Sequence, residues 1–125
     1  MTDKKKILVV DDEEQMLDLI TAFLSQAGYE VTAAVDGETA LALAGKVLPD
    51  LILMDIQLPK IDGWLVCHRL KIDENLKKIP IILFSGMVAT DAQADLTVEK
   101  CDYLMAKPIE LNNLLKKVKE FINPS

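Results

Sequence analysis

The chain has 125 residues, 50% of them hydrophobic and 27% charged, which is the size and composition of one globular domain with a single core. Its formal net charge of −6 argues against direct binding to nucleic acid, which requires a basic surface. No apolar run approaches the roughly 20 residues that span a membrane, and residues 7–10 are too short for the core of a signal peptide. These features predict one cytoplasmic domain over residues 1–125, without membrane insertion.

Five apolar runs of strand length alternate with five segments of helical periodicity. Strands are expected at residues 6–10, 29–34, 51–55, 81–84 and 103–106. Helices are expected from about residue 11 to 27, 37 to 48, 64 to 72, 91 to 100 and 109 to 122. In the third helix, the side chains expected to face inward are Leu65, Val66, Cys67 and Leu70. Regular alternation of strands and helices predicts an α/β fold, a three-layer doubly wound (βα)5 sandwich around a parallel five-stranded sheet.

The run Leu51–Asp55 is apolar until its last residue, which is a carboxylate. A strand without alternation is typical of the buried centre of a parallel sheet, and ligands bind at the carboxyl edge of such sheets. Polar residues also follow three other strands: Asp11 and Asp12, then Ser85, then Lys107. Because the carboxyl ends of parallel strands share one edge, we expect three carboxylates, one hydroxyl and one ammonium to converge there.

Three carboxylates in one cleft repel one another unless a cation is present. Mg²⁺ prefers oxygen ligands, so a metal held by Asp12 and Asp55, with Asp11 acting directly or through water, would resolve the repulsion. Phosphoryl transfer needs little beyond positioning and charge neutralisation. The pattern therefore predicts that Asp55 is a nucleophile that forms an aspartyl phosphate, while Lys107 and Ser85 pair with the phosphoryl oxygens.

Each of these residues also has an ordinary structural interpretation. Asp11 and Asp12 would cap the first helix, Asp55 would face solvent in a loop, Ser85 would belong to a turn and Lys107 would precede a helix. Their coincidence at the edge that a parallel sheet creates favours the functional interpretation.

Five motifs carry a family resemblance: ILVVDDEE at 7–14, DG at 36–37, LILMDIQLPKIDGW at 51–64, IPIILFSG at 79–86 and AKP at 106–108. In this order and spacing the chain resembles the receiver domain of a two-component response regulator over essentially its whole length. The resemblance implies a flavodoxin-like fold with strand order 2-1-3-4-5. It also implies Mg²⁺, with Mn²⁺ as the alternative ion, bound by Asp12, Asp55 and the backbone carbonyl of Gln57, and by Asp11 through water.

The same resemblance implies a signalling switch and not an enzyme, apart from its own phosphorylation and autodephosphorylation. Asp55 would accept a phosphoryl group from a histidine kinase or a histidine phosphotransfer protein, and Ser85 and Lys107 would be switch residues. The change would alter a partner-binding or dimerisation surface formed by the fourth helix, fifth strand and fifth helix, toward an unknown effector. Since Met1 nearly abuts the first strand and Ser125 closely follows the last helix, the sequence predicts a stand-alone receiver or a truncated N-terminal domain.

Two positions depart from the family pattern. An aromatic residue is common three positions before the lysine, but Leu104 stands there and Tyr103 precedes it, so we expect the aromatic ring on the opposite face of the strand. Lys100 replaces the usual glycine before the fifth strand, which predicts a different end for the fourth helix.

Two other functions are compatible with this fold class. A phosphatase of the haloacid dehalogenase type would use the same aspartyl phosphate, but it needs an aspartate where this chain has Gln57. A flavodoxin-like cofactor carrier needs a Ser/Thr/Gly-rich loop after the first strand, where this chain has Asp11 and Asp12.

Overall fold

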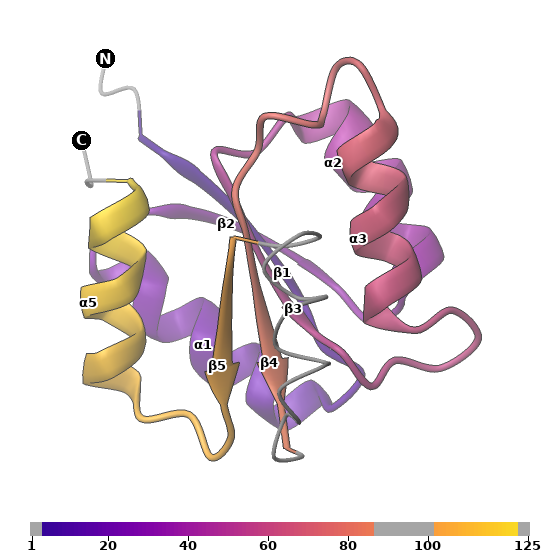
Figure 1. Cartoon of the computed structure of the whole chain (residues 1–125). Coiled ribbons are helices and arrows are strands. Elements are labelled where there is room, and N and C mark those ends of the chain that lie inside the picture. Colours follow the sequence, from indigo (N-terminus) through magenta and orange to yellow (C-terminus); the bar gives the residue numbers. More distant parts are fainter. Residues whose placement is uncertain (1–3, 87–101, 123–125) are drawn as a thin grey trace.

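Five parallel strands form the central sheet, in the order β2-β1-β3-β4-β5 (Figure 1). The computed structural model describes residues 4–86 and 102–122. The strands are β1 Lys6–Val10, β2 Glu30–Ala34, β3 Leu51–Asp55, β4 Ile81–Ser85 and β5 Tyr103–Ala106. The predicted strands and their order are therefore confirmed, although β2 begins one residue later and β4 ends one residue later than expected.

Four described helices cover the two faces of this sheet, with α1 and α5 on one side and α2 and α3 on the other (Figure 1). Their bounds are α1 Glu14–Gln26, α2 Gly37–Val47, α3 Gly63–Ile72 and α5 Leu111–Phe121. Within the described parts of the chain, none of these helices combines the length and the apolarity needed to cross a membrane. The helix expected at 91–100, and with it the expectation for Lys100, lies outside the described residues.

The α5 helix begins two residues later than the sequence predicts because Glu110 acts as its N-cap. The Glu110 carboxylate accepts hydrogen bonds from the backbone N–H groups of Asn112 at 3.1 Å and Asn113 at 2.9 Å. These bonds satisfy amides that have no partner inside the first turn of a helix.

Alternating side chains of the central strands supply two hydrophobic cores, one on each face of the sheet. The α2–α3 side core has the following buried members: Leu8, Val10, Ala34, Ala40, Ala44, Ile52, Met54, Val66, Cys67, Leu70, Leu76, Ile81 and Leu83. The α1–α5 side core has these: Ile7, Val9, Leu17, Ile20, Leu24, Tyr29, Leu51, Leu53, Ile82, Phe84, Leu114 and Val118. Every residue of β3 is buried, as expected for the central strand of a sheet covered on both faces.

The expected inward face of α3 was wrong at one position. Val66, Cys67 and Leu70 are buried, but the Leu65 side chain is 41% exposed. Successive residues are about 100° apart around a helix, so Leu65 turns away from the face that Val66 and Leu70 share. Trp64 is partly buried and packs against the α2–α3 side core.

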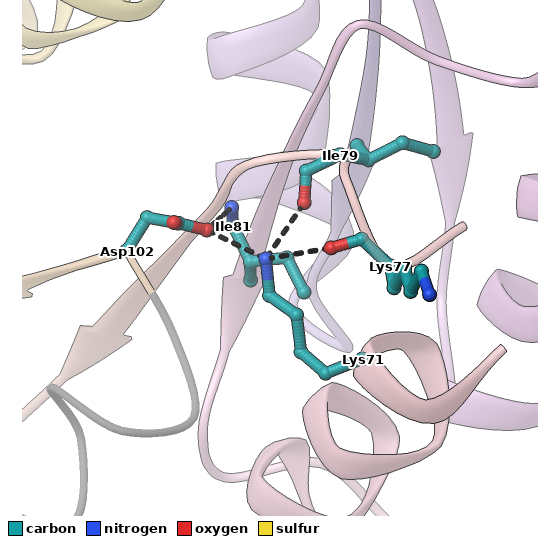
Figure 2. Close-up of polar contacts among 5 residues, drawn as sticks. All are labelled: Lys71, Lys77, Ile79, Ile81 and Asp102. Atoms are coloured by element: carbon teal, nitrogen blue, oxygen red, sulfur yellow. Dashed lines mark hydrogen bonds and ion pairs between the residues drawn. The ribbon is translucent and has the colours of Figure 1, made fainter. Parts of the chain in front are cut away.

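At the amino end of β4, Lys71 from the last turn of α3 joins three segments of the chain (Figure 2). Its Nζ donates to Asp102 Oδ2 at 2.9 Å and to the Ile79 carbonyl oxygen at 3.0 Å, with a longer contact to the Lys77 carbonyl at 3.5 Å. The same Asp102 Oδ2 accepts the backbone N–H of Ile81 at 2.7 Å. One carboxylate oxygen thus ties the start of β4 to the residue that precedes β5.

Replacing Lys71 with Met keeps the aliphatic stem and removes the ammonium from this network. We expect the free energy of unfolding in urea to fall by about 1 kcal/mol, because the Ile79 carbonyl loses a donor and the Asp102 carboxylate keeps only the Ile81 N–H. Lys77→Met is the matched control, since it breaks an exposed Lys77–Glu74 pair of 3.0 Å that should contribute almost nothing. Equal losses in the two variants would contradict the role assigned to Lys71.

Candidate functional site

Strand pairing brings the predicted site residues to the carboxyl edge of the sheet. Asp11 follows β1 and Asp55 ends β3, and these two strands are neighbours. Ser85 ends β4, which pairs with β3, and Lys107 follows β5, which pairs with β4. The backbone N–H of Lys107 donates to the Ser85 carbonyl oxygen at 2.8 Å, so the two residues are held side by side.

Three carboxylates cluster at this edge. Asp11, Asp12 and Asp55 each place one oxygen within 4.8 Å of the others. Asp11 and Asp55 are buried, whereas Asp12 is exposed, so the cluster opens to solvent on the Asp12 side. The expected convergence of the three carboxylates is present, and an all-oxygen donor set of this kind suits a hard divalent cation.

Asp11 is fully buried, yet only one of its oxygens has a hydrogen-bond partner within residues 4–86 and 102–122. Oδ1 accepts the backbone N–H of Glu13 at 2.9 Å, while Oδ2 accepts no hydrogen bond from the described residues. Burial raises the pKa of Asp11 and the charge of Asp55 adds to this, against the opposing effects of the Glu13 N–H and Lys107. A buried oxygen without a donor is unfavourable, and a cation beside it would remove the penalty.

The helix-capping interpretation does not account for this arrangement. The N-cap residue of α1 is Glu13, and its side chain makes no capping hydrogen bond. Asp11 therefore bonds to the residue before the helix and leaves its second carboxylate oxygen directed to no protein donor among the described residues.

Lys107 reaches across β4 to Asp55 and offsets one of the three negative charges. Its Nζ lies 2.5 Å from Asp55 Oδ2, and Asp55 Oδ1 accepts the backbone N–H of Gln57 at 3.0 Å. Burial alone would lower the pKa of Lys107, but the hydrogen bond and charge of Asp55, with the charges of Asp11 and Glu13, raise it above its ordinary value. A lysine that stays charged here can receive an anionic group at Asp55.

The charge of Glu13 acts on the site although the sequence pattern did not single it out. It belongs to the acidic run at residues 11–14, and its charge helps to raise the pKa of Lys107. Gln57 lies next to Asp55 as expected, and its backbone carbonyl as a metal ligand stays a prediction.

The shifted aromatic residue on β5 lies on the face opposite to Leu104, as predicted. Leu104 packs against the α2–α3 side core. Lys117 of α5 lies over the Tyr103 ring, with its Nζ 4.0 Å from the ring centroid. An aromatic ring on the Leu104 face is therefore missing from the described part of β5.

The fold and the site define a doubly wound α/β protein with an acidic cluster, suited to bind a cation, at the carboxyl edge of its sheet. Residues 7–119 match the family described as response regulator receiver domain, and the chain belongs to this family. Its members are phosphorylation-dependent signalling switches of two-component systems, and receiver domains bind Mg²⁺ in an acidic pocket.

Relatives support this assignment along most of the chain. The DNA-binding dual master transcriptional regulator RpaA of Synechocystis is 35% identical over 94% of this chain, which spans about half (48%) of that protein. The polar-differentiation response regulator DivK of Brucella abortus is 33% identical over 94% of this chain and 96% of its own length. The high resolution structure of the chemotaxis response regulator CheY4 of Vibrio cholerae superposes with a TM-score of 0.87, at 27% identity over 94% of this chain and 98% of that one.

A divalent cation at the acidic cluster should stabilise the folded chain. In denaturant titrations, excess Mg²⁺ should raise the free energy of unfolding over the value in chelator, by about 2.7 kcal/mol when the free ion is at 100 times its Kd. Asp12→Asn should lose most of this increment because it removes a charged oxygen ligand. Asp18→Asn, on the exposed surface of α1, is the control and should keep it. An equal response of the two variants to Mg²⁺ would place the ion elsewhere.

Proposed function

We propose that residues 1–125 act as one receiver domain in which Asp55 accepts a phosphoryl group from a phospho-histidine donor. The donor is a histidine kinase or a histidine phosphotransfer protein, and the proposal places the chain in the cytoplasm with that donor. The observation that carries the proposal is the Lys107–Asp55 contact of 2.5 Å beside the carboxylates of Asp11 and Asp12. A nucleophilic carboxylate, a fixed ammonium and a cation-binding set are thereby gathered at one open edge.

In the proposed reaction, a carboxylate oxygen of Asp55 attacks the phosphorus atom as the bond from phosphorus to the donor's imidazole nitrogen breaks. Lys107 then pairs with one phosphoryl oxygen and the Ser85 hydroxyl donates to another, so both stabilise charge that Asp55 alone would repel. Asp12, Asp55 and the Gln57 carbonyl would hold Mg²⁺ or Mn²⁺ directly and Asp11 through water. The ion, when bound, supplies neutralisation of the phosphoryl charge.

The proposed chemistry ends with hydrolysis of the chain's own aspartyl phosphate and does not extend to other substrates. Gln57 occupies the position where a phosphatase of the dehalogenase type carries its general acid, and an amide does not take that role. The acidic residues Asp11 and Asp12 would repel the phosphate of a flavin cofactor. Sustained release of phosphate from a generic phosphoester would overturn this part of the proposal.

For the signalling output, we propose only that phosphorylation changes a binding surface near β5 and α5. The names of the relatives specify different outputs, DNA binding in one protein and polar differentiation in another. Their similarity to this chain therefore supports a shared input, phosphorylation, and leaves the effector or a dimerisation partner to experiment.

Asp55→Asn tests the acceptor directly. With Mg²⁺ and a phosphorylated histidine kinase domain or a small acyl phosphate, the wild-type chain should gain one phosphoryl group by intact mass, and the variant should gain none. Asp50→Asn is the matched control, because Asp50 precedes the opposite end of β3 and accepts only the Lys6 N–H at 2.8 Å among its described contacts. Equal labelling of Asp55→Asn and wild type would refute the assignment.

A further inference from the structure

The first residue of α3 lies directly against the backbone of the proposed phosphate acceptor. The Gly63 N–H donates to the Ile56 carbonyl oxygen at 2.7 Å. A Cβ added to Gly63 would lie 2.6 Å from the Asp55 carbonyl oxygen and 2.7 Å from Ile56 Cα. Both neighbours are backbone atoms, so neither can swing aside as a flexible side chain would.

Close approach, and not backbone conformation, is what requires glycine at this position. Among the glycines of the described segments, positive φ occurs at Gly28, whereas Gly63 is the first helical residue of α3. Alanine is the better helix former at such a position and also restricts the unfolded chain more. Local preference thus favours alanine, and the contact with Asp55 and Ile56 opposes it.

The two peptide groups on either side of Ile56 Cα are both held by hydrogen bonds. The Ile56 N–H donates to the Phe84 carbonyl of β4 at 3.0 Å, and the Ile56 carbonyl accepts from both Gly63 and Leu58, the latter at 3.2 Å. The next residue, Gln57, bonds through its N–H to Asp55 Oδ1. Moving the start of α3 away from β3 would therefore shift the Asp55 carboxylate and the Gln57 backbone together.

We propose that Gly63 is a positioning residue for phosphoryl transfer, an inference that rests on the proposed function of Asp55. Because Gly63 has no side chain, α3 can press against the end of β3 and hold the acceptor carboxylate where it meets Lys107 and the other two carboxylates. The residue does not touch the reacting atoms, and it acts through the backbone of Asp55 and Ile56.

Gly63→Ala tests this role. We expect the rate constant for labelling by acetyl phosphate in saturating Mg²⁺, counted per folded molecule, to fall about 10-fold or more, since a misplacement of about 1 Å can cost an enzyme about 100-fold. The Mg²⁺ concentration for half-maximal labelling should rise, because the Gln57 backbone moves as well. Gly45→Ala is the control: its added Cβ would meet nothing within 4 Å, and its labelling rate should equal that of wild type.

A second pair of variants tests the same contact without adding bulk. Asp62, which is exposed, and Asp36, which is half-buried, are N-caps that each precede a glycine, and they accept the N–H groups of Leu65 at 2.9 Å and Thr39 at 2.8 Å. Replacing either with Ala removes one helix N-cap, so both variants should lower the denaturation midpoint, and labelling is compared per folded molecule. Only Asp62→Ala should slow labelling, because only α3 begins against the acceptor strand.

The outcomes separate the two proposals. If wild type is not labelled, the proposed function fails. If wild type is labelled and Gly63→Ala is less stable but labels at the wild-type rate when folded, Gly63 is a structural residue and the positioning role is overturned. Should Gly63→Ala not fold, equal labelling of Asp62→Ala and Asp36→Ala would overturn it instead.

Discussion

The ion pair between Lys107 and Asp55 joins residues that leave β5 and β3, two strands that do not touch each other. Its formation depends on the strand between them, because β4 sets both the distance and the register of its neighbours. Without the ammonium, two buried carboxylates and one exposed carboxylate would face one another uncompensated. Much of the architecture can be understood as what holds this pair in place.

Contacts at the amino edge of the sheet also help to position the Lys107–Asp55 ion pair. Asp102 accepts the N–H of Ile81 and pairs with Lys71, which fixes where β4 begins relative to the entry of β5. A strand that slipped by one residue would turn every side chain to the other face, and Lys107 would then point away from Asp55. The Lys71–Asp102 ion pair lies at the surface, far from the acidic cluster, and still helps to fix the geometry of that cluster.

Periodicity and strand-end chemistry were enough to predict the five strands, the three carboxylates and the lysine, because each depends on local pattern and on the parallel arrangement. The strand order came from resemblance to a family, since no local signal distinguishes it from other orders. The prediction that Leu65 faces inward was wrong because α3 carries more apolar residues than its inward face can hold. The Lys71–Asp102 pair joins residues 31 positions apart, and neither belongs to a motif.

The close contact of Gly63 with the acceptor strand could not be predicted from the sequence either. The sequence marks it only as the glycine of an Asp-Gly pair, and Asp36 and Gly37 form another such pair. What distinguishes the two is the atom that a side chain would meet: a side-chain atom, Cγ2 of Val66, is the nearest at Gly37, whereas a backbone atom, the carbonyl oxygen of the acceptor, is the nearest at Gly63. The angle at which a helix approaches a strand decides this, and no residue pattern encodes it.

The position of Trp64 gives the chain an optical reporter of its own. It is the single tryptophan of the sequence, it follows Gly63 directly, and its indole is partly buried against the α2–α3 side core. The emission of an indole depends on the polarity of its surroundings, so intrinsic fluorescence should respond when the first turn of α3 changes its packing. Events at the acceptor strand could be followed in real time without a label, in the unmodified protein.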